Sequence, residues 1–230
     1  MYKKVMMGTS AIKEQLMQMP NLPKLLGEMQ LVLNSERHKR LAFYQWVQED
    51  MKAEFINGEI IENSPVADEH SDTVSALHSL SYNCALFQES GKVKSEKAMV
   101  SLTRNDYEPD IAFWRKEVAA TFKMGQTHYP APDWICEVLS KGTSGRDRGI
   151  KFDDYAAHGV REYWIVHPRK KTIEQYLLSD ETETYELLKK VTMGDWIESV
   201  TMKGFRIPVS AIFDVDINRE TLKKIITGML

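Results

Sequence analysis

The sequence predicts an α/β (α+β) domain in which a mixed central sheet is flanked by helices. Helix-like and strand-like segments follow one another in the order helix, strands, helix, strands. Residues 133–166 have a strand–helix–strand order, which requires a parallel crossover. The other strand-like segments come in runs joined by short turns, which is typical of hairpins. The sheet should therefore contain both parallel and antiparallel pairs.

Residues 1–34 are predicted to form an amino-terminal appendage to a single domain spanning residues 35–230. Pro20 and Pro23 interrupt the appendage, and its leucines and methionines lack a clean helical spacing. We expect it to pack on the domain or on a second subunit. The domain begins with a predicted helix at residues 35–50, whose apolar residues form a broad face.

A hairpin and a long helix are predicted next. Asn57 and Gly58 lie between two apolar-alternating runs, residues 52–56 and 59–63, and both tolerate the positive φ that a tight hairpin turn needs. Residues 68–90 then give the clearest helical pattern of the chain. Its apolar residues recur at helical intervals as Val74, Leu77, Leu80, Cys84 and Phe87.

The middle of the chain predicts the centre of the sheet. Residues 133–140 are apolar on both faces, which is typical of a central strand, and residues 144–158 form the predicted crossover helix. The longest irregular stretch precedes this strand, at residues 125–132. The other predicted strands are residues 93–95, 98–103, 110–114, 161–166, 172–178, 185–191, 196–200 and 205–207, and a last helix covers residues 218–228.

Composition limits the classes of protein. The chain has 230 residues and two cysteines, Cys84 and Cys136, with no CxxC motif, which argues against a zinc ribbon or a disulfide scaffold. No apolar run approaches the length of a membrane span. We therefore expect a protein of the reducing cytoplasm that is not embedded in a membrane.

The charge balance counts mildly against a nucleic-acid partner. The net charge is −3, whereas strong binders of phosphate backbones usually carry an excess of Lys and Arg. A local basic group could still contact nucleic acid. The candidates that fall close together are Lys141, Arg146, Arg148 and Lys151.

Three residues form the candidate catalytic group. Asp110 heads an apolar strand, Glu137 lies between Ile135-Cys136 and Val138-Leu139, and Lys151 lies on the following helix. A carboxylate within an apolar strand must be paired, hydrogen-bonded or bound to a metal. Two buried carboxylates and an amine can hold Mg²⁺ and a water against a phosphodiester. This combination predicts a nuclease that uses Mg²⁺ and accepts Mn²⁺ in its place.

Each of these residues also has a purely structural interpretation. Asp110 could hydrogen-bond local backbone at a strand end. Glu137 could form a buried ion pair with an Arg or Lys. Lys151 follows Asp147 by one helical turn, and such pairs are usually solvated salt bridges on a helix surface.

A series of motifs matches one known family. In chain order they are residues 54–60, Ser64-Pro65 with His70, Glu108-Pro109-Asp110, residues 132–140, residues 151–155, residues 159–166 and residues 207–213. Over residues 38–213 the chain thereby resembles the Uma-type restriction endonucleases, a family of the PD-(D/E)xK nuclease superfamily. The resemblance implies a restriction-endonuclease-like core and metal-dependent hydrolysis of phosphodiester bonds.

The resemblance also implies roles for single residues. Asp110 and Glu137 would be metal ligands. Because Mg²⁺ takes oxygen ligands, the backbone carbonyl of Val138 could add a third contact. The superfamily usually places its lysine two residues after the glutamate, where this chain has Leu139. This family carries the amine on the next helix instead, which maps to Lys151.

Three further residues are accessory candidates. In related nucleases an acid of the first helix can complete the metal shell, and this suggests Glu69 as an extra ligand. His70 matches a histidine common in the family, although it could equally be a helix residue that packs near Val74. Tyr155 lies one turn after Lys151 and could face the cleft, but aromatic packing is its alternative role.

The sequence thus predicts a DNA endonuclease and leaves two alternatives open. DNA is the expected substrate, and a homodimer is expected because cutting two strands favours a paired arrangement. One alternative is a non-catalytic module of the same fold that binds a protein or nucleic-acid partner. The other is an unrelated protein whose acids make buried ion pairs.

Overall fold

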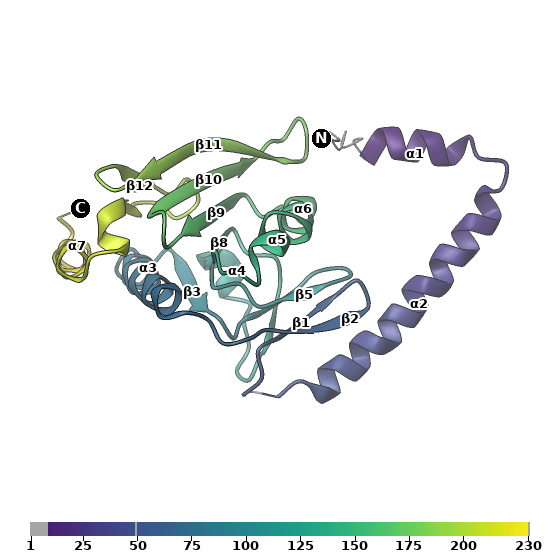
Figure 1. Cartoon of the computed structure of the whole chain (residues 1–230), viewed down its shortest axis with the longest axis horizontal. Coiled ribbons are helices and arrows are strands. Elements are labelled where there is room, and N and C mark those ends of the chain that lie inside the picture. The colour runs from purple at the N-terminus through teal and green to yellow at the C-terminus, as the bar shows by residue number, and fades with distance from the viewer. Residues whose placement is uncertain (1–8, 49, 230) are drawn as a thin grey trace.

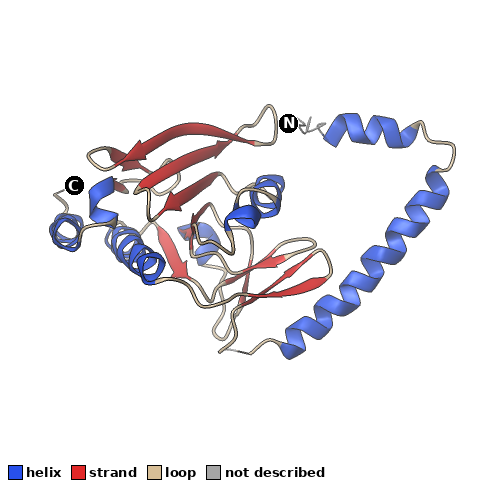
Figure 2. Cartoon of the chain, in the orientation of Figure 1, coloured by secondary structure: helices blue, strands red, loops and turns tan. Residues whose placement is uncertain are grey.

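The computed structural model describes residues 9–48 and 50–229 (Figure 1). Two sheets and the helices around them form the body, and a pair of helices, α1 (Thr9–Met17) and α2 (Leu22–Trp46), extends away from it (Figures 1 and 2). The predicted fold class, a mixed sheet flanked by helices, is confirmed. Within the described part of the chain, no helix combines the length and the apolar character needed to traverse a bilayer.

The main sheet has six strands in the order β11-β10-β9-β8-β6-β3. Strands β8 (Trp134–Val138) and β9 (Glu162–His167) pair in parallel, which confirms the predicted crossover. All other neighbours in this sheet are antiparallel. The remaining four strands are β3 (Gly91–Ser95), β6 (Ile111–Arg115), β10 (Thr172–Leu178) and β11 (Tyr185–Thr192).

The crossover consists of two short helices where the sequence predicts one. They are α5 (Ser144–Asp147) and α6 (Ile150–Ala157). Gly149 separates them with backbone angles outside the helical region (φ −124°, ψ −106°). A Cβ atom at this position would lie 2.9 Å from the carbonyl oxygen of Gly145, so the close approach of the two turns favours glycine.

The second sheet has five strands in the order β2-β1-β5-β4-β7. The hairpin of β1 (Ala53–Ile56) and β2 (Glu59–Glu62) is confirmed, and its turn residues Asn57 and Gly58 both have positive φ. The other three strands are β4 (Met99–Ser101), β5 (Asp106–Tyr107) and β7 (His128–Tyr129). Strands β5 and β7 were not predicted, because each has only two residues, which are too few to show a period.

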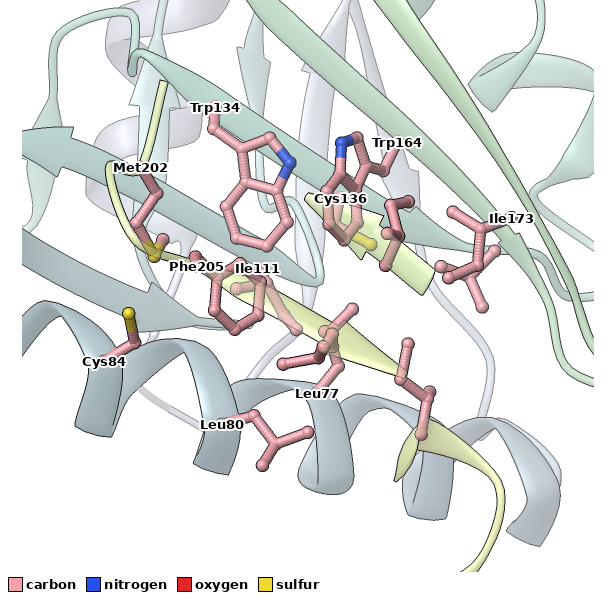
Figure 3. Packing of buried hydrophobic residues seen from close by; sticks show 14 of the residues in the cluster. Leu77, Leu80, Cys84, Ile111, Trp134, Cys136, Trp164, Ile173, Met202 and Phe205 are labelled. Carbon is pink, nitrogen blue, oxygen red and sulfur yellow. The ribbon is translucent and has the colours of Figure 1, made fainter. Parts of the chain in front are cut away.

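The main core lies between helix α3 (Asp68–Phe87) and one face of the six-stranded sheet (Figure 3). Leu77 and Leu80 of α3 meet Trp134 and Trp164 of the sheet, whose rings pack edge to face with centroids 5.1 Å apart. Helix α7 (Val215–Thr227) packs beside α3 (Figure 1). The remaining elements are α4 (Lys116–Ala119), β12 (Trp196–Glu198), β13 (Arg206–Pro208) and the 3₁₀ turn η1 (Val209–Ile212).

We expect Leu80→Ala to lower the free energy of unfolding by about 2–5 kcal/mol, because Leu80 is fully buried and its truncation leaves a cavity. Leu86→Ala on the same helix is the matched control, because Leu86 is 54% exposed and should change stability by less than about 0.5 kcal/mol. Chemical denaturation of both variants measures the difference. Equal effects would contradict this description of the core.

Helix α2 begins earlier than the sequence indicates. The predicted helix at residues 35–50 is the second half of an uninterrupted helix that starts at Leu22 and ends at Trp46. No helix was predicted over residues 22–34, because their apolar residues lack helical spacing, but an exposed helix needs no such spacing. Residues 1–8 of the predicted appendage lie outside the described residues.

The carboxyl-terminal half of α2 is held by the second sheet. Phe43 is fully buried against Phe55 of β1. Arg40 forms a bidentate pair with Asp106 at 2.6 and 2.7 Å, and Arg104 holds Glu36. These contacts fix the carboxyl-terminal half of α2 against the second sheet. Strand β1 of that sheet contributes to the site described below.

Candidate active site

A cleft of about 640 Å³ opens where several loops of the body meet. Its wall contains the loop between β2 and α3, the first turn of α3, the loop between β8 and α5, and the turn after β9. Asp110, Glu137 and Lys151 all line it. The three predicted catalytic residues therefore share one cavity.

Asp110 and Glu137 converge because β6 and β8 are neighbours in the sheet. Asp110 precedes β6, and the register pairs Ile111 with Cys136. The backbone N–H of Asp110 donates to Oε2 of Glu137 at 3.2 Å, and the N–H of Val138 donates to Oδ2 of Asp110 at 2.8 Å. Each acid is thus held by the strand that carries the other. This excludes the alternative in which Glu137 lies far from Asp110.

The alternation of strand β8 aims Glu137 at helix α6. Trp134, Cys136 and Val138 face the core beneath α3, whereas Ile135 belongs to the cluster on the opposite face. Glu137 lies on that opposite face. There Tyr155 of α6 donates to its Oε1 at 3.4 Å.

Lys151 is buried among carboxylates. Its Nζ lies 2.8 Å from Oε1 of Glu54, 3.1 Å from Oε1 of Glu137 and 3.6 Å from Oδ1 of Asp147. Its side chain is 4% exposed, so the solvated surface pair considered for Lys151 is wrong. The buried ion pair considered for Glu137 does occur, with Lys151 as its partner, and it coexists with the position of both residues in the cleft.

Acidic side chains outnumber basic side chains around this cluster. Burial raises the pKa of Glu137 to about 8 despite the nearby charge of Lys151. Burial also raises the pKa of Glu108 to about 7 and that of Asp147 above its ordinary value. Burial alone would lower the pKa of Lys151, but the surrounding carboxylates raise it well above the usual range. The lysine is therefore charged, and the raised pKa values show that burial and mutual repulsion keep the surrounding acids from all being ionised at once without a further cation.

Asp110 differs from the other acids. Burial would raise its pKa, but the hydrogen bond from His70 and the charge of Lys52 outweigh burial and leave the pKa below its ordinary value. The two contacts are Nε2 of His70 to Oδ2 at 3.2 Å and Nζ of Lys52 to Oδ1 at 3.5 Å. Asp110 is accordingly ionised at neutral pH and ready to bind a metal, whereas Glu137 would lose its proton when a cation binds.

Several carboxylate oxygens lack hydrogen-bond donors. Both oxygens of Asp147, Oε2 of Glu54 and Oε2 of Glu108 are buried without a hydrogen-bond partner. Buried oxygens in this state are costly unless a cation or a water satisfies them. Their number, and the excess of acidic over basic side chains, fit a hard divalent cation.

The donor set fits Mg²⁺ better than a softer metal. Over residues 9–48 and 50–229, no three His, Cys, Asp or Glu side chains form a ready-made cage. Mg²⁺ does not need one, because it keeps several waters and is usually held by one or two carboxylates. Asp110 and Glu137 are the pair that could hold it. For Val138 the contact seen is that of its N–H with Asp110.

The accessory candidates lie around the cleft in different settings. His70 is in the site, through its contact with Asp110. Glu69 lines the cleft, but it is paired with Arg169 at 2.6 Å and its side chain is 43% exposed. Tyr155 is fully buried below Glu137 and packs edge to face on Tyr107, so it combines a site contact with aromatic packing.

The predicted basic group divides into two parts. Lys141 and Arg146 line the cleft, and Arg146 donates to Asn63 at 2.9 Å. Arg148 pairs with Glu174 at 2.6 Å and is not part of the cleft wall. Lys151 is enclosed by the acids. Lys141 and Arg146 are therefore the two members placed to meet a ligand in the cleft.

Sequence reasoning missed four charged residues of the site. Glu54 is 1% exposed in the apolar strand β1, so the reasoning that singled out Glu137 would have found it too. Asp147 was interpreted as a surface partner of Lys151 and is buried. Glu108 and Lys52 carried no signal, because they lie next to strand ends where charged residues are common.

A comparison with family models decides the relationship of the chain. Residues 40–210 match the model Uma2, described as "Putative restriction endonuclease". The chain belongs to the Uma2 family. The resemblance seen in the sequence over residues 38–213 is thereby confirmed.

One solved structure shows the same fold as this Uma2-family protein. The chain is similar to a crystal structure of a putative nuclease belonging to DUF820 from Anabaena variabilis ATCC 29413, with a TM-score of 0.62 and 17% identity over 78% of this chain and 96% of that chain. A weaker likeness to the type IIG restriction endonuclease BpuSI has a TM-score of 0.35 and 12% identity over 72% of this chain and 18% of that chain, and carries no argument. No curated protein matches the sequence.

Proposed function

We propose that this Uma2-family protein is an endonuclease that hydrolyses DNA phosphodiester bonds with Mg²⁺, for which Mn²⁺ can substitute. One observation carries the proposal: Asp110, Glu137 and Lys151 come from three separate elements and meet in the wall of one cleft. The family description and the nuclease named in the similar crystal structure support the same class of reaction.

Each residue of the site has a separate role in the proposed reaction. A cation bound by Asp110 and Glu137 would polarise a phosphoryl oxygen and lower the pKa of a water molecule. His70 and the N–H of Val138 orient Asp110 and keep it ionised. Lys151 orients Glu137 through its 3.1 Å contact and offsets part of the charge of the buried acids. The carbonyl of Val138 and the side chain of Glu69 are possible further ligands.

Lys52 is the amine best placed to meet the substrate. Its side chain is 26% exposed, compared with 4% for Lys151, and it lines the cleft within 3.5 Å of Asp110. A scissile phosphate that entered the cleft would reach Lys52 before the enclosed Lys151. Lys52 would then stabilise the negative charge that develops on the phosphoryl group.

Lys52→Met is therefore expected to reduce the cleavage rate by about 10²-fold, because one positive group beside the reacting phosphate is lost. Single-turnover cleavage with saturating Mn²⁺ measures the rate, and Mn²⁺ affinity is measured in parallel. Lys123→Met, an exposed loop lysine, is the control and should keep the original rate. An unchanged rate in Lys52→Met would contradict this role.

The proposed function is tested by incubating supercoiled plasmid with the full chain in Mg²⁺, in Mn²⁺ and in EDTA. Nicked or linear product with either metal and none in EDTA is expected. Absence of product with both metals, over a range of pH and salt concentration and on several DNA substrates, would contradict it.

The net charge of −3 favours a second candidate, a non-catalytic module of the nuclease fold that binds a partner. In that case Lys151 and Glu137 would be a structural ion pair. Titration calorimetry with Mn²⁺ separates the two candidates. Heat of binding that disappears in Glu137→Gln supports the enzyme, and no heat in the original chain supports the module.

A further inference from the structure

The two amino-terminal helices leave the body as an arm. We define the arm as residues 11–35, which cover most of α1 and the first half of α2 (Figure 1). Of the described side chains in this range none is buried, and the first buried residue of α2 is Glu36. The arm therefore lies largely in solvent, whereas the second half of α2 is docked on the body.

The arm is unusually apolar for a solvated segment. Eight of its large apolar side chains are exposed, by 39% at Met19 to 71% at Leu31, whereas Leu16, Leu22 and Leu25 are half-buried. A soluble monomer rarely exposes so many neighbouring apolar side chains. The exposed members are Ile12, Met17, Met19, Leu26, Met29, Leu31, Val32 and Leu33.

One face of α2 is covered by the body at one end and uncovered at the other. Glu36 and Phe43 are its two buried residues and are one heptad apart. The same register continues into the arm at Met29 and Leu22, and Val32, three residues after Met29, lies on the same face. The body reaches α2 only from Glu36 onward, and beyond it Met29 and Val32 of this stripe are exposed.

The arm needs a partner to remain helical. Helices shorter than about 12–15 residues are marginal in water, and α1 has 9 residues. Gly27 lies inside the exposed half of α2 and lowers its helix propensity further. Burial of the apolar stripe would supply the missing stabilisation.

The charges of the arm identify the kind of partner. The arm carries two lysines, Lys13 and Lys24, and two glutamates, Glu14 and Glu28, so its net charge is zero. Lys24 and Glu28 form a salt bridge at 3.9 Å. A nucleic acid would require a basic surface, and a helix lying on a membrane favours basic residues on its polar face. A neutral apolar surface is complementary to another like itself, and two-fold symmetry places the same surface on both chains.

From these observations we propose that the arm is a dimerisation element, covered by the arm of a second copy of this chain. The proposal does not depend on the enzymatic activity. If the protein cleaves DNA, the dimer would present two clefts to the two strands. If the arm instead folded back on its own body or bound an unrelated protein, the purified chain would be a monomer in solution.

Sedimentation equilibrium of the full chain between about 1 and 100 µM tests the proposal, with dimer formation expected in the micromolar range or tighter. The expected mass is about 53 kDa, twice the 26.5 kDa of one chain. The double variant Met29→Glu with Val32→Glu should weaken the dimer by about 100-fold or more, because two charges would be buried in the contact. Leu41→Glu is the matched control, since Leu41 is exposed on α2 outside the arm.

The arm variants should unfold at the temperature measured for the Leu41→Glu control when all are compared as monomers, since the arm is not part of the core. A disulfide between Met29→Cys chains that carry two different tags would support contact between copies. A monomer at 100 µM, or a dimer that the double variant leaves intact, would overturn the proposal. Both results are independent of whether the chain cleaves DNA.

Discussion

Glu137→Gln is expected to reduce metal-dependent DNA cleavage by about 10³-fold or more. The substitution removes one of the two carboxylates that would hold the cation, and with it the group that places the metal beside the phosphate. The fold should survive, because the raised pKa of Glu137, about 8, indicates that the site accepts the neutral side chain at neutral pH. Plasmid cleavage and thermal unfolding measure the two effects separately.

The matched control for this variant is Glu59→Gln. Glu59 lies on the hairpin strand β2 and is exposed, so its loss should leave cleavage and stability unchanged. If Glu137→Gln cleaved DNA at the original rate, Glu137 would not be a ligand and the proposed mechanism would be wrong. If it failed to fold, the comparison would be repeated with Glu137→Asp, which keeps the charge and should retain partial metal binding.

Lys151→Met is expected to have the largest effect on stability. The variant leaves Glu54, Glu137 and Asp147 buried without their common cation, and breaking a buried ion pair in this way costs about 3–5 kcal/mol. Cleavage should fall as well, because Glu137 loses the contact that orients it. Urea denaturation in EDTA measures the loss of stability.

Two further measurements make this prediction specific. Mn²⁺ should raise the unfolding temperature of Lys151→Met more than that of the original chain, because the added cation replaces part of the lost charge. Lys123→Met, which removes an exposed lysine, should change stability by less than about 0.5 kcal/mol. A Lys151→Met protein as stable as the original would show that the carboxylates do not depend on this lysine.

The sequence predicts the centre of the site well because the signal there is local. An acid inside an apolar strand is costly wherever the strand lies, so Glu137 stands out without knowledge of the fold. Asp110 and Glu137 lie close together because β6, which follows Asp110, and β8, which carries Glu137, are neighbours in the sheet. The parallel pairing of β8 and β9 follows from the strand–helix–strand order of the chain. Glu54 has the same local signature, in a strand that was interpreted only as half of a hairpin.

Features that depend on tertiary packing were missed. Asp147 and Lys151 have the spacing of a surface pair, and only the position of α5 and α6 against the sheet buries them. Strands β5 and β7 have two residues each and are defined by the strands beside them. The amino-terminal half of α2 has no buried face of its own, and periodicity therefore gave no helix there.

The proposed reaction requires a divalent cation between two carboxylates, and a crystal of the full chain soaked in Mn²⁺ tests this most directly. An anomalous difference peak is expected within coordination distance of both Asp110 and Glu137, at about 2.0–2.3 Å from their oxygens. The peak should be absent from crystals of Glu137→Gln. Mn²⁺ bound elsewhere in the cleft, or no bound Mn²⁺ in crystals of a chain that cleaves DNA with Mn²⁺, would contradict the assignment.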